Sequence, residues 1–146
     1  VKIPVIAAGG IADGRGVVAA LTLGASAVQI GSAYLLTEEA KISPIHKAIL
    51  LSSAAEETAL TNLFSGKPAR SVKNRLMREL GPLSSTVPPF PFAGKALGTL
   101  KSFTEKMGSG DFMSLWSGQS VTLRKEQLSA EELTRRILKE MDDLSF

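Results

Sequence analysis

Two short apolar runs, each ended by glycine and separated by one helix-like segment, constrain the fold of this chain more than any other feature. The first run, residues 3–8 (IPVIAA), is followed by Gly9 and Gly10, and the second, residues 27–30 (AVQI), is followed by Gly31. Continuous apolar runs that are partly β-branched are typical of strands buried on both faces of a parallel sheet. We therefore predict two parallel strands joined by a helix, with a right-handed crossover.

The segment between the two runs has the features of an amphipathic helix. Asp13 stands where a side chain can cap the first turn, and Gly24 stands where a helix often ends. The apolar residues Val17, Ala20 and Leu21 are spaced so that they share one helical face. The chain from residue 3 to residue 31 is thus predicted to be a complete βαβ unit.

The glycines that end the two strands predict an anion site. In parallel α/β sheets, ligands bind beyond the carboxyl ends of the strands. Glycine there lets the backbone approach an anion closely, and nearby N–H groups then donate to phosphate oxygens. Strands that end in Gly9-Gly10 and Gly31-Ser32 can hold one phosphate jointly, with the Ser32 hydroxyl as a further donor. In a (β/α)₈ barrel such a site follows strands seven and eight, and a short helix often completes it, as residues 32–40 would here.

A simpler interpretation is that these glycines serve only as tight turns and helix caps. Either glycine motif alone is compatible with that interpretation. Their occurrence at the ends of two consecutive strands favours the phosphate site instead. The pattern indicates a phosphate-bearing ligand without specifying which one.

The composition narrows the class of protein. The chain has 146 residues, no cysteine and a formal net charge of +3. The absence of cysteine excludes a disulfide scaffold and thiolate metal sites, and it fits a reducing cytoplasm. We predict no metal site. The mild positive charge suits a phosphate-bearing small molecule but lacks the interleaved aromatics of a nucleic-acid patch. No apolar run approaches the ~20 residues that a membrane helix needs, so we expect neither a nucleic acid nor a membrane as partner.

The sequence changes in character after residue 42. We assign residues 1–42 to the phosphate-binding unit and residues 43–146 to a helix-rich extension that packs on it. Helices are expected at residues 44–53, with Pro44 in the first turn, and at 71–80, 95–106 and 118–127. A last helix is expected from Ser129 onward, where Glu132 completes a capping box. A β-biased segment is expected near residues 58–66. The proline-rich stretch 87–94 is expected to be an irregular loop.

Residues 3–40 (IPVIAAGGIADGRGVVAALTLGASAVQIGSAYLLTEEA) resemble the seventh- and eighth-strand region of nitronate monooxygenases, formerly called 2-nitropropane dioxygenases. These are FMN-dependent (β/α)₈ flavoenzymes. The resemblance continues through residues 57–80 (ETALTNLFSGKPARSVKNRLMREL) and 110–120 (GDFMSLWSGQS), so it covers nearly all of the chain. The FMN-dependent enoyl-[acyl-carrier-protein] reductases share much of the first stretch, but the segment SVKNRLMREL favours the nitronate monooxygenases.

The resemblance implies a set of cofactor-binding residues. The residues that it places at the FMN phosphate are Gly9, Gly10, Gln29, Ile30, Gly31 and Ser32. The second of these segments usually ends in Gly-Thr in the family, and the serine of this chain keeps the hydroxyl. Gln119 is a weaker candidate for a polar contact in the active site, because a Gly-Gln pair recurs near the flavin in the resembling families.

The implied activity is the oxidation of alkyl nitronates with O₂ by an FMN-dependent oxidoreductase, a monooxygenase. In the resembling enzymes the active-site histidine precedes this region. The only histidine here is His46, which matches no catalytic position, and we interpret it as an ordinary packed or surface histidine. No catalytic residue is therefore assigned.

A complete barrel takes about 250 residues and eight strands, whereas this chain supplies two barrel strands. We therefore expect an α/β fold that forms the C-terminal part of a (β/α)₈ TIM barrel, namely its last two parallel strands followed by a mostly helical extension. The missing N-terminal part of the barrel would be needed for activity. Two alternatives remain: an FMN-dependent enoyl-[acyl-carrier-protein] reductase, and a catalytically inactive remnant that at most binds a phosphate ligand.

Overall fold

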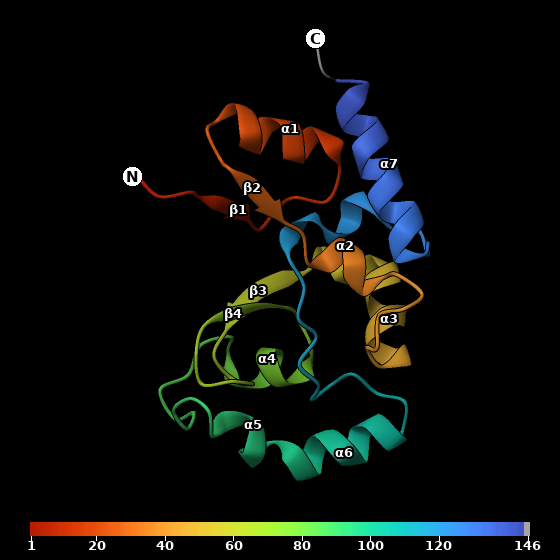
Figure 1. Ribbon diagram of the computed structural model, residues 1–146. Helices are drawn as coiled ribbons and strands as arrows, with labels where there is room; N and C mark the ends of the chain where they lie inside the picture. Colours follow the sequence, from red (N-terminus) through yellow and green to blue (C-terminus); the bar gives the residue numbers. More distant parts are fainter. Residues whose placement is uncertain (145–146) are drawn as a thin grey trace. The chain divides into compact units, whose positions relative to one another are not determined.

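The computed structural model describes residues 1–144 and divides the chain into two compact units (Figure 1). The first unit contains Val1–Ile42 together with the segment that starts at Gly118, and the second unit is Ser43–Ser117. The chain thus leaves the first unit after Ile42 and returns to it at Gly118. The sequence predicts one extension over all of residues 43–146, whereas the segment that starts at Gly118 belongs to the first unit.

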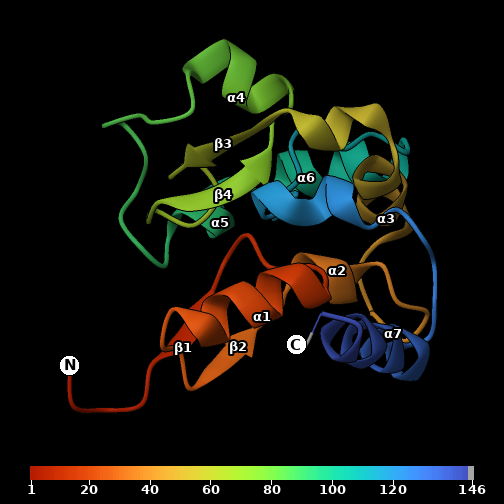
Figure 2. The ribbon, with the colours of Figure 1, turned by 90° about the horizontal axis from the view of Figure 1, so that it is seen from above.

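The first unit is built around a parallel pair of strands. Its elements are β1 (Ile6–Ala8), α1 (Gly14–Thr22), β2 (Ala27–Gln29), α2 (Ser32–Leu35), the 3₁₀ helix η2 (Gln119–Leu123) and α7 (Ala130–Asp142). β1 and β2 pair in parallel, with Ala7 opposite Val28, and α1 connects them. This confirms the predicted βαβ unit and the short helix that follows its second strand (Figure 2).

Local capping explains where the helices of this unit begin and end. The carboxylate of Asp13 accepts a hydrogen bond of 3.0 Å from the Gly16 N–H, which satisfies a free donor of the first turn of α1. Gly24, at φ +98°, takes the left-handed conformation that lets the chain turn away after α1. At α7 the predicted capping box is present, since Ser129 and Glu132 each bond the other's backbone N–H.

The two strands differ from the prediction in their burial. The sequence predicts burial on both faces, yet in β1 and β2 the central residue is half-buried and its two neighbours are exposed. Ile3 and Ile6 are 73% and 62% exposed. Within residues 1–144 the sheet has only two strands, so each strand has an edge that no other strand covers.

The core of the first unit lies between α1, α2 and α7. Its buried residues are Ala12, Val17, Ala33, Leu133 and Ile137. The side chains of Val28 and Ile30 pack against this cluster from β2 and the residues after it. The C-terminal helix therefore belongs to the same core as the glycine-ended strands.

The second unit contains a β-hairpin surrounded by helices. Its elements are α3 (Pro44–Leu51), η1 (Ser53–Glu56), β3 (Thr58–Thr61), β4 (Ala69–Val72), α4 (Arg75–Leu80), α5 (Ala93–Ala96) and α6 (Gly98–Lys106). β3 and β4 are antiparallel. The irregular loop predicted near residues 87–94 is present as far as Phe92. In the core of the second unit, the rings of Phe64 and Trp116 meet edge to face, with their centroids 5.8 Å apart.

Several of the predicted helices have different bounds. The single helix predicted over residues 95–106 is two helices, α5 and α6, and the helix predicted from Pro44 to residue 53 ends at Leu51. The helix predicted over residues 71–80 begins only at Arg75, because the residues before it pair with β3 and Asn74 caps the first turn. The helix predicted over residues 118–127 is only the short 3₁₀ helix η2. None of the helices in residues 1–144 combines the length and the apolar character that crossing a membrane requires.

Candidate phosphate-binding site

A cavity of about 230 Å³ lies at the carboxyl ends of β1 and β2 in the first unit. We call it the glycine cavity. It is lined by Ala8, Gly9, Gly10, Ile11, Gln29, Gly31, Ser32, Gly118 and Ser120. The structure thus brings together, around one space, every residue predicted for the phosphate site except Ile30.

The conformations of the glycines differ between the two strand ends. Gly9 and Gly10 have φ values of +90° and +75°, which residues with a side chain rarely adopt, so the backbone itself requires glycine there. Gly31 has φ −108° and ψ −69°, values that other residues can adopt. A Cβ built on Gly31 would have no atom of the described residues within 4 Å. Neither the backbone conformation nor a close contact among the described residues therefore requires glycine at position 31.

Ser32 links the strand end to a distant segment. Its Oγ accepts a hydrogen bond of 2.7 Å from the N–H of Gly118, which is 86 residues away in the sequence. A hydroxyl carries one donor and two acceptor sites, so the Ser32 proton is still available to a ligand oxygen. The bond therefore fixes the position of the hydroxyl without using its donor.

The segment that starts at Gly118 forms a wall of the cavity that the sequence analysis missed. Gly118 and the buried Ser120 line the cavity, whereas Gln119, the residue chosen from the sequence, is exposed and does not line it. The Gly-Gln pair in the sequence indicated this segment, but the prediction used the side chain of Gln119. In the structure the neighbouring residues Gly118 and Ser120 line the cavity. Ile30 also lies outside the lining, because side chains alternate along an extended strand and that of Ile30 joins the apolar core.

Charged groups lie just beyond the cavity, where α1 begins. Burial raises the pKa of Asp13, but the Gly16 N–H and the Arg15 guanidinium together bring it below its usual value. Burial likewise raises the pKa of Glu140, and the Gly14 N–H and the Arg124 guanidinium lower it further than burial raises it. Both carboxylates are therefore ionised at neutral pH. Neither of them lines the glycine cavity.

His46 lies in the second unit and is buried there. Its Nε2 is 3.1 Å from the carbonyl oxygen of Trp116, so this nitrogen carries the proton and donates it. Burial lowers the pKa of His46, and the bond to Trp116 partly offsets this effect. The interpretation of His46 as a packed histidine is confirmed. Residues 1–144 also contain no group of three or more His, Cys, Asp or Glu side chains suited to a metal ion.

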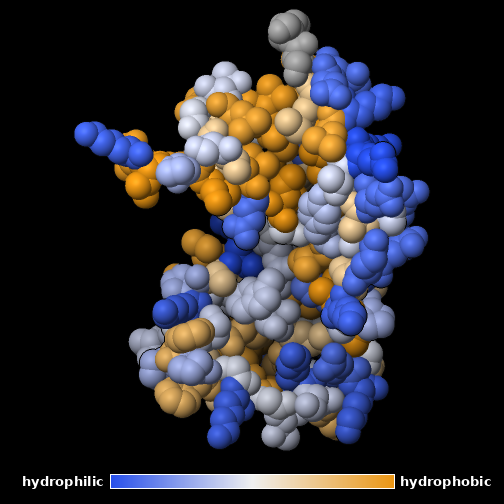
Figure 3. Space-filling view, in the orientation of Figure 1, coloured by the Kyte–Doolittle hydropathy of each residue, from blue (hydrophilic) through white to orange (hydrophobic). Residues whose placement is uncertain are grey.

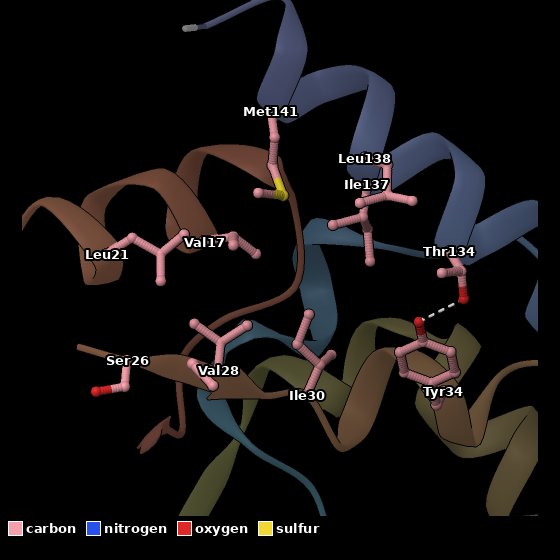
Figure 4. Close-up of a pocket in the computed structure, with 11 residues that line it drawn as sticks. Val17, Leu21, Ser26, Val28, Ile30, Tyr34, Thr134, Ile137, Leu138 and Met141 are labelled. Carbon is pink, nitrogen blue, oxygen red and sulfur yellow. Dashed lines mark hydrogen bonds between the residues drawn. The ribbon is translucent and has the colours of Figure 1, made fainter. Parts of the chain in front are cut away.

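A second cavity in the first unit, of about 410 Å³, lies between α1, β2 and α7. Figure 4 shows Val17, Val28 and Ile137 facing it from these three elements, and Figure 3 shows apolar side chains gathered between α1 and α7. Its polar groups are few, and the hydroxyls of Tyr34 and Thr134 bond each other at 2.7 Å. This apolar cleft has no charged lining residue and is not a candidate for binding an anion.

The parallel βαβ unit and the cavity at the ends of its strands define an α/β protein. The sequence profile of the nitronate monooxygenase family matches residues 1–140, and the chain belongs to that family. A probable nitronate monooxygenase of Bacillus subtilis (strain 168) is 40% identical over 139 residues, which are 95% of this chain and 40% of that protein. A probable nitronate monooxygenase of Staphylococcus saprophyticus is 35% identical over 144 residues, 99% of this chain and 40% of that protein.

Solved structures give the same result for the fold. A nitroalkane oxidase from Streptomyces ansochromogenes matches 98% of this chain and 40% of its own, with a TM-score of 0.89 and 36% identity. FabK from Thermotoga maritima matches 99% of this chain and 46% of its own, with a TM-score of 0.72 and 30% identity. The chain therefore spans about 40% of the length of the curated relatives named above.

Proposed function

We propose that this chain forms the FMN-phosphate-binding part of an oxidoreductase that oxidises alkyl nitronates with O₂. The single observation that carries the proposal is the glycine cavity, which lies at the carboxyl ends of two parallel strands and is lined by the glycines of both. This is where parallel α/β proteins bind phosphate groups. Membership of the nitronate monooxygenase family supports the choice of reaction.

The residues around the cavity fit a phosphate group. The lining contains no aspartate or glutamate, so no carboxylate repels an anion there. Gly9 and Gly10, in their left-handed conformations, present backbone rather than side chains to the space. Ser32 offers its hydroxyl proton, and Gln29 offers the amide N–H₂ of its side chain.

In the proposed enzyme this chain binds and orients the cofactor. When bound, FMN supplies the electron transfer and the oxygen chemistry. The glycine backbone and Ser32 would hold the phosphate end of the cofactor and so orient the rest of it. We assign no proton transfer to His46, because its Nε2 is committed to the Trp116 carbonyl in the second unit. Gln119 remains a proposed polar contact for the substrate, and its exposed side chain leaves it available.

We further propose that the remaining strands of the barrel come from sequence outside these 146 residues. The relatives are longer than this chain, which covers 40% of the Bacillus subtilis protein. The exposed Ile3 and Ile6 side chains are suited to contact with such strands. In this arrangement residues 1–42 supply the last two strands of the barrel.

A second candidate is an FMN-dependent enoyl-[acyl-carrier-protein] reductase, which the structural similarity to FabK favours. The oxidation of a nitronate and the reduction of an enoyl thioester can be told apart by the reagents that they consume. Nitronate-dependent uptake of O₂ without a nicotinamide supports the first candidate, and NAD(P)H-dependent reduction of an enoyl thioester supports the second. Neither turnover, with FMN still bound, would indicate a catalytically inactive remnant.

Gly31→Leu in the full-length protein tests the phosphate site. At this position leucine fills the cavity without backbone strain, whereas Gly10→Leu would combine occlusion with strain at φ +75°. Gly98→Leu is the matched control, because a Cβ there also has no atom within 4 Å and lies in the other unit. We expect Gly31→Leu to purify folded but without FMN, and Gly98→Leu to keep it. Full FMN content in a folded Gly31→Leu protein would refute the site.

A further inference from the structure

Arg124, which follows η2, contacts two separate parts of the first unit. Its Nε donates to the carbonyl oxygen of Ala12 at 3.2 Å, across 112 residues of sequence. Its guanidinium also pairs closely with both carboxylate oxygens of Glu140 on α7. Glu140 in turn accepts a hydrogen bond of 2.8 Å from the N–H of Gly14. Arg124 and Glu140 thus hold the peptide segment from Ala12 to Gly14 from two sides.

These contacts lie next to both walls of the glycine cavity. Ala12 directly follows Ile11, which lines the cavity on the side of β1. Arg124 directly follows η2, and the start of the same segment supplies Gly118 and Ser120 to the other wall. The bond between Arg124 and Ala12 therefore connects the two walls. The bond between Ser32 and Gly118 connects them a second time.

The Arg124–Glu140 pair is shielded from water, unlike the other ion pairs of α7. The side chain of Arg124 is 10% exposed and that of Glu140 is 32% exposed. The Arg135–Glu131 pair on the same helix is 77% and 71% exposed. Exposed pairs contribute little, whereas a charge-assisted pair that is largely shielded from water is stronger and holds its partners more firmly. Glu140 and both members of the exposed pair lie on α7, so the Arg135–Glu131 pair is a control for the Arg124–Glu140 pair.

The packing at Gly14 shows how closely α7 approaches this segment. A Cβ on Gly14 would lie 2.5 Å from the Cβ of Glu140 and 2.7 Å from the backbone nitrogen of Met141. The start of α1 is thus in direct contact with the backbone of α7. A shift of Glu140 would therefore move Gly14 and, through Ala12, the segment 9–11 that lines the glycine cavity.

We infer that Arg124 and Glu140 are positioning residues for the glycine cavity: by linking Ala12, Gly14 and α7 they set the separation of its two walls and thereby its affinity for a phosphate group. The inference rests on the proposed function, since it concerns the same cavity. Neither residue lines the cavity, so their effect on a ligand acts through the backbone that they hold.

The test compares FMN with riboflavin, which lacks the phosphate, on the full-length protein after removal of its flavin. The dissociation constants of both ligands are measured for the wild type, Arg124→Lys, Glu140→Gln and the control Arg135→Lys. Lysine keeps the charge but loses the fork that reaches Ala12 and Glu140 together. We expect the preference for FMN over riboflavin to fall about tenfold in the first two variants, the lower end of what losing an outer hydrogen-bonding partner costs at a ligand site. Arg135→Lys should keep the preference.

The outcomes separate this inference from the proposed function. A wild type that binds riboflavin as tightly as FMN would overturn the phosphate site and this inference with it. A wild type that prefers FMN, with Arg124→Lys and Glu140→Gln that prefer it equally, would overturn the inference alone. Equal weakening of both ligands would also overturn it, because that result reports general destabilisation. The melting temperature of each flavin-free variant provides the independent measure of stability.

Discussion

Gly14→Ala is the substitution whose effect the structure specifies most directly. Gly14 is the first residue of α1, and its missing side chain lets the helix start touch the backbone of α7. An added Cβ would lie 2.5 Å from the Glu140 Cβ. Ordinary carbon contacts lie at about 3.5–4.0 Å, so α1 and α7 would have to separate by roughly 1 Å. Because the contact is to backbone, no side-chain rotation can relieve it.

The cost follows from two opposing effects. Forcing an additional carbon into a packed contact costs about 1–3 kcal/mol. Replacing glycine by alanine stabilises the interior of a helix by up to about 1 kcal/mol, and stabilises its first residue by less. The separation also weakens the bond from the Gly14 N–H to Glu140. We therefore expect a net destabilisation of the first unit of about 1–2 kcal/mol, since the contact outweighs the gain in propensity.

The assay is hydrogen exchange of the peptides that contain α1 and α7, because it reports local stability. A loss of this size should accelerate their exchange roughly 5- to 30-fold and leave the second unit unchanged. Gly98→Ala is the matched control, since Gly98 is also the first residue of a helix, α6, but a Cβ there meets nothing within 4 Å. Exchange in Gly98→Ala should be unchanged or slower. Unchanged protection of α1 and α7 in Gly14→Ala would refute the close packing described here.

Two further predictions concern the second unit. Burial lowers the pKa of His46, so the unfolded chain binds a proton at this residue more tightly than the folded chain does, and the free energy of unfolding should fall as the pH drops below 6.5, the ordinary pKa of histidine. His46→Gln should flatten this pH dependence in urea titrations between pH 7 and pH 5. An unchanged slope would contradict the lowered pKa of His46. The side-chain amide of Asn74 donates to the carbonyls of Gly110 and Met113. Asn74→Asp turns both hydrogen bonds into repulsions between oxygens and should lower the free energy of unfolding by about 3 kcal/mol. An unchanged urea midpoint would show that these two hydrogen bonds do not stabilise the unit.

The local features of the βαβ unit could be read from the sequence because they depend on neighbouring residues. Asp13 caps α1 and Gly24 ends it, as the spacing of polar and apolar residues predicts. The glycines at the two strand ends were sufficient to locate the candidate site, since parallel strands bring their carboxyl ends to one edge. The start of the helix predicted over residues 71–80 was wrong, because pairing of Ser71 and Val72 with β3 outweighed helical periodicity there.

Only the tertiary structure decided which distant residues complete the site. The Ser32–Gly118 bond spans 86 residues and the Arg124–Ala12 bond spans 112, and no local pattern encodes either contact. Gln119, predicted as an active-site contact, does not line the cavity, whereas its neighbours Gly118 and Ser120 do. The sequence by itself determined which short segments become strands, caps and glycine turns, because those depend on backbone preference and periodicity. Tertiary packing determined which distant residues contact one another. The chain returns to the first unit at Gly118 and continues into α7, which packs on α1, and this brings the second wall of the cavity into place.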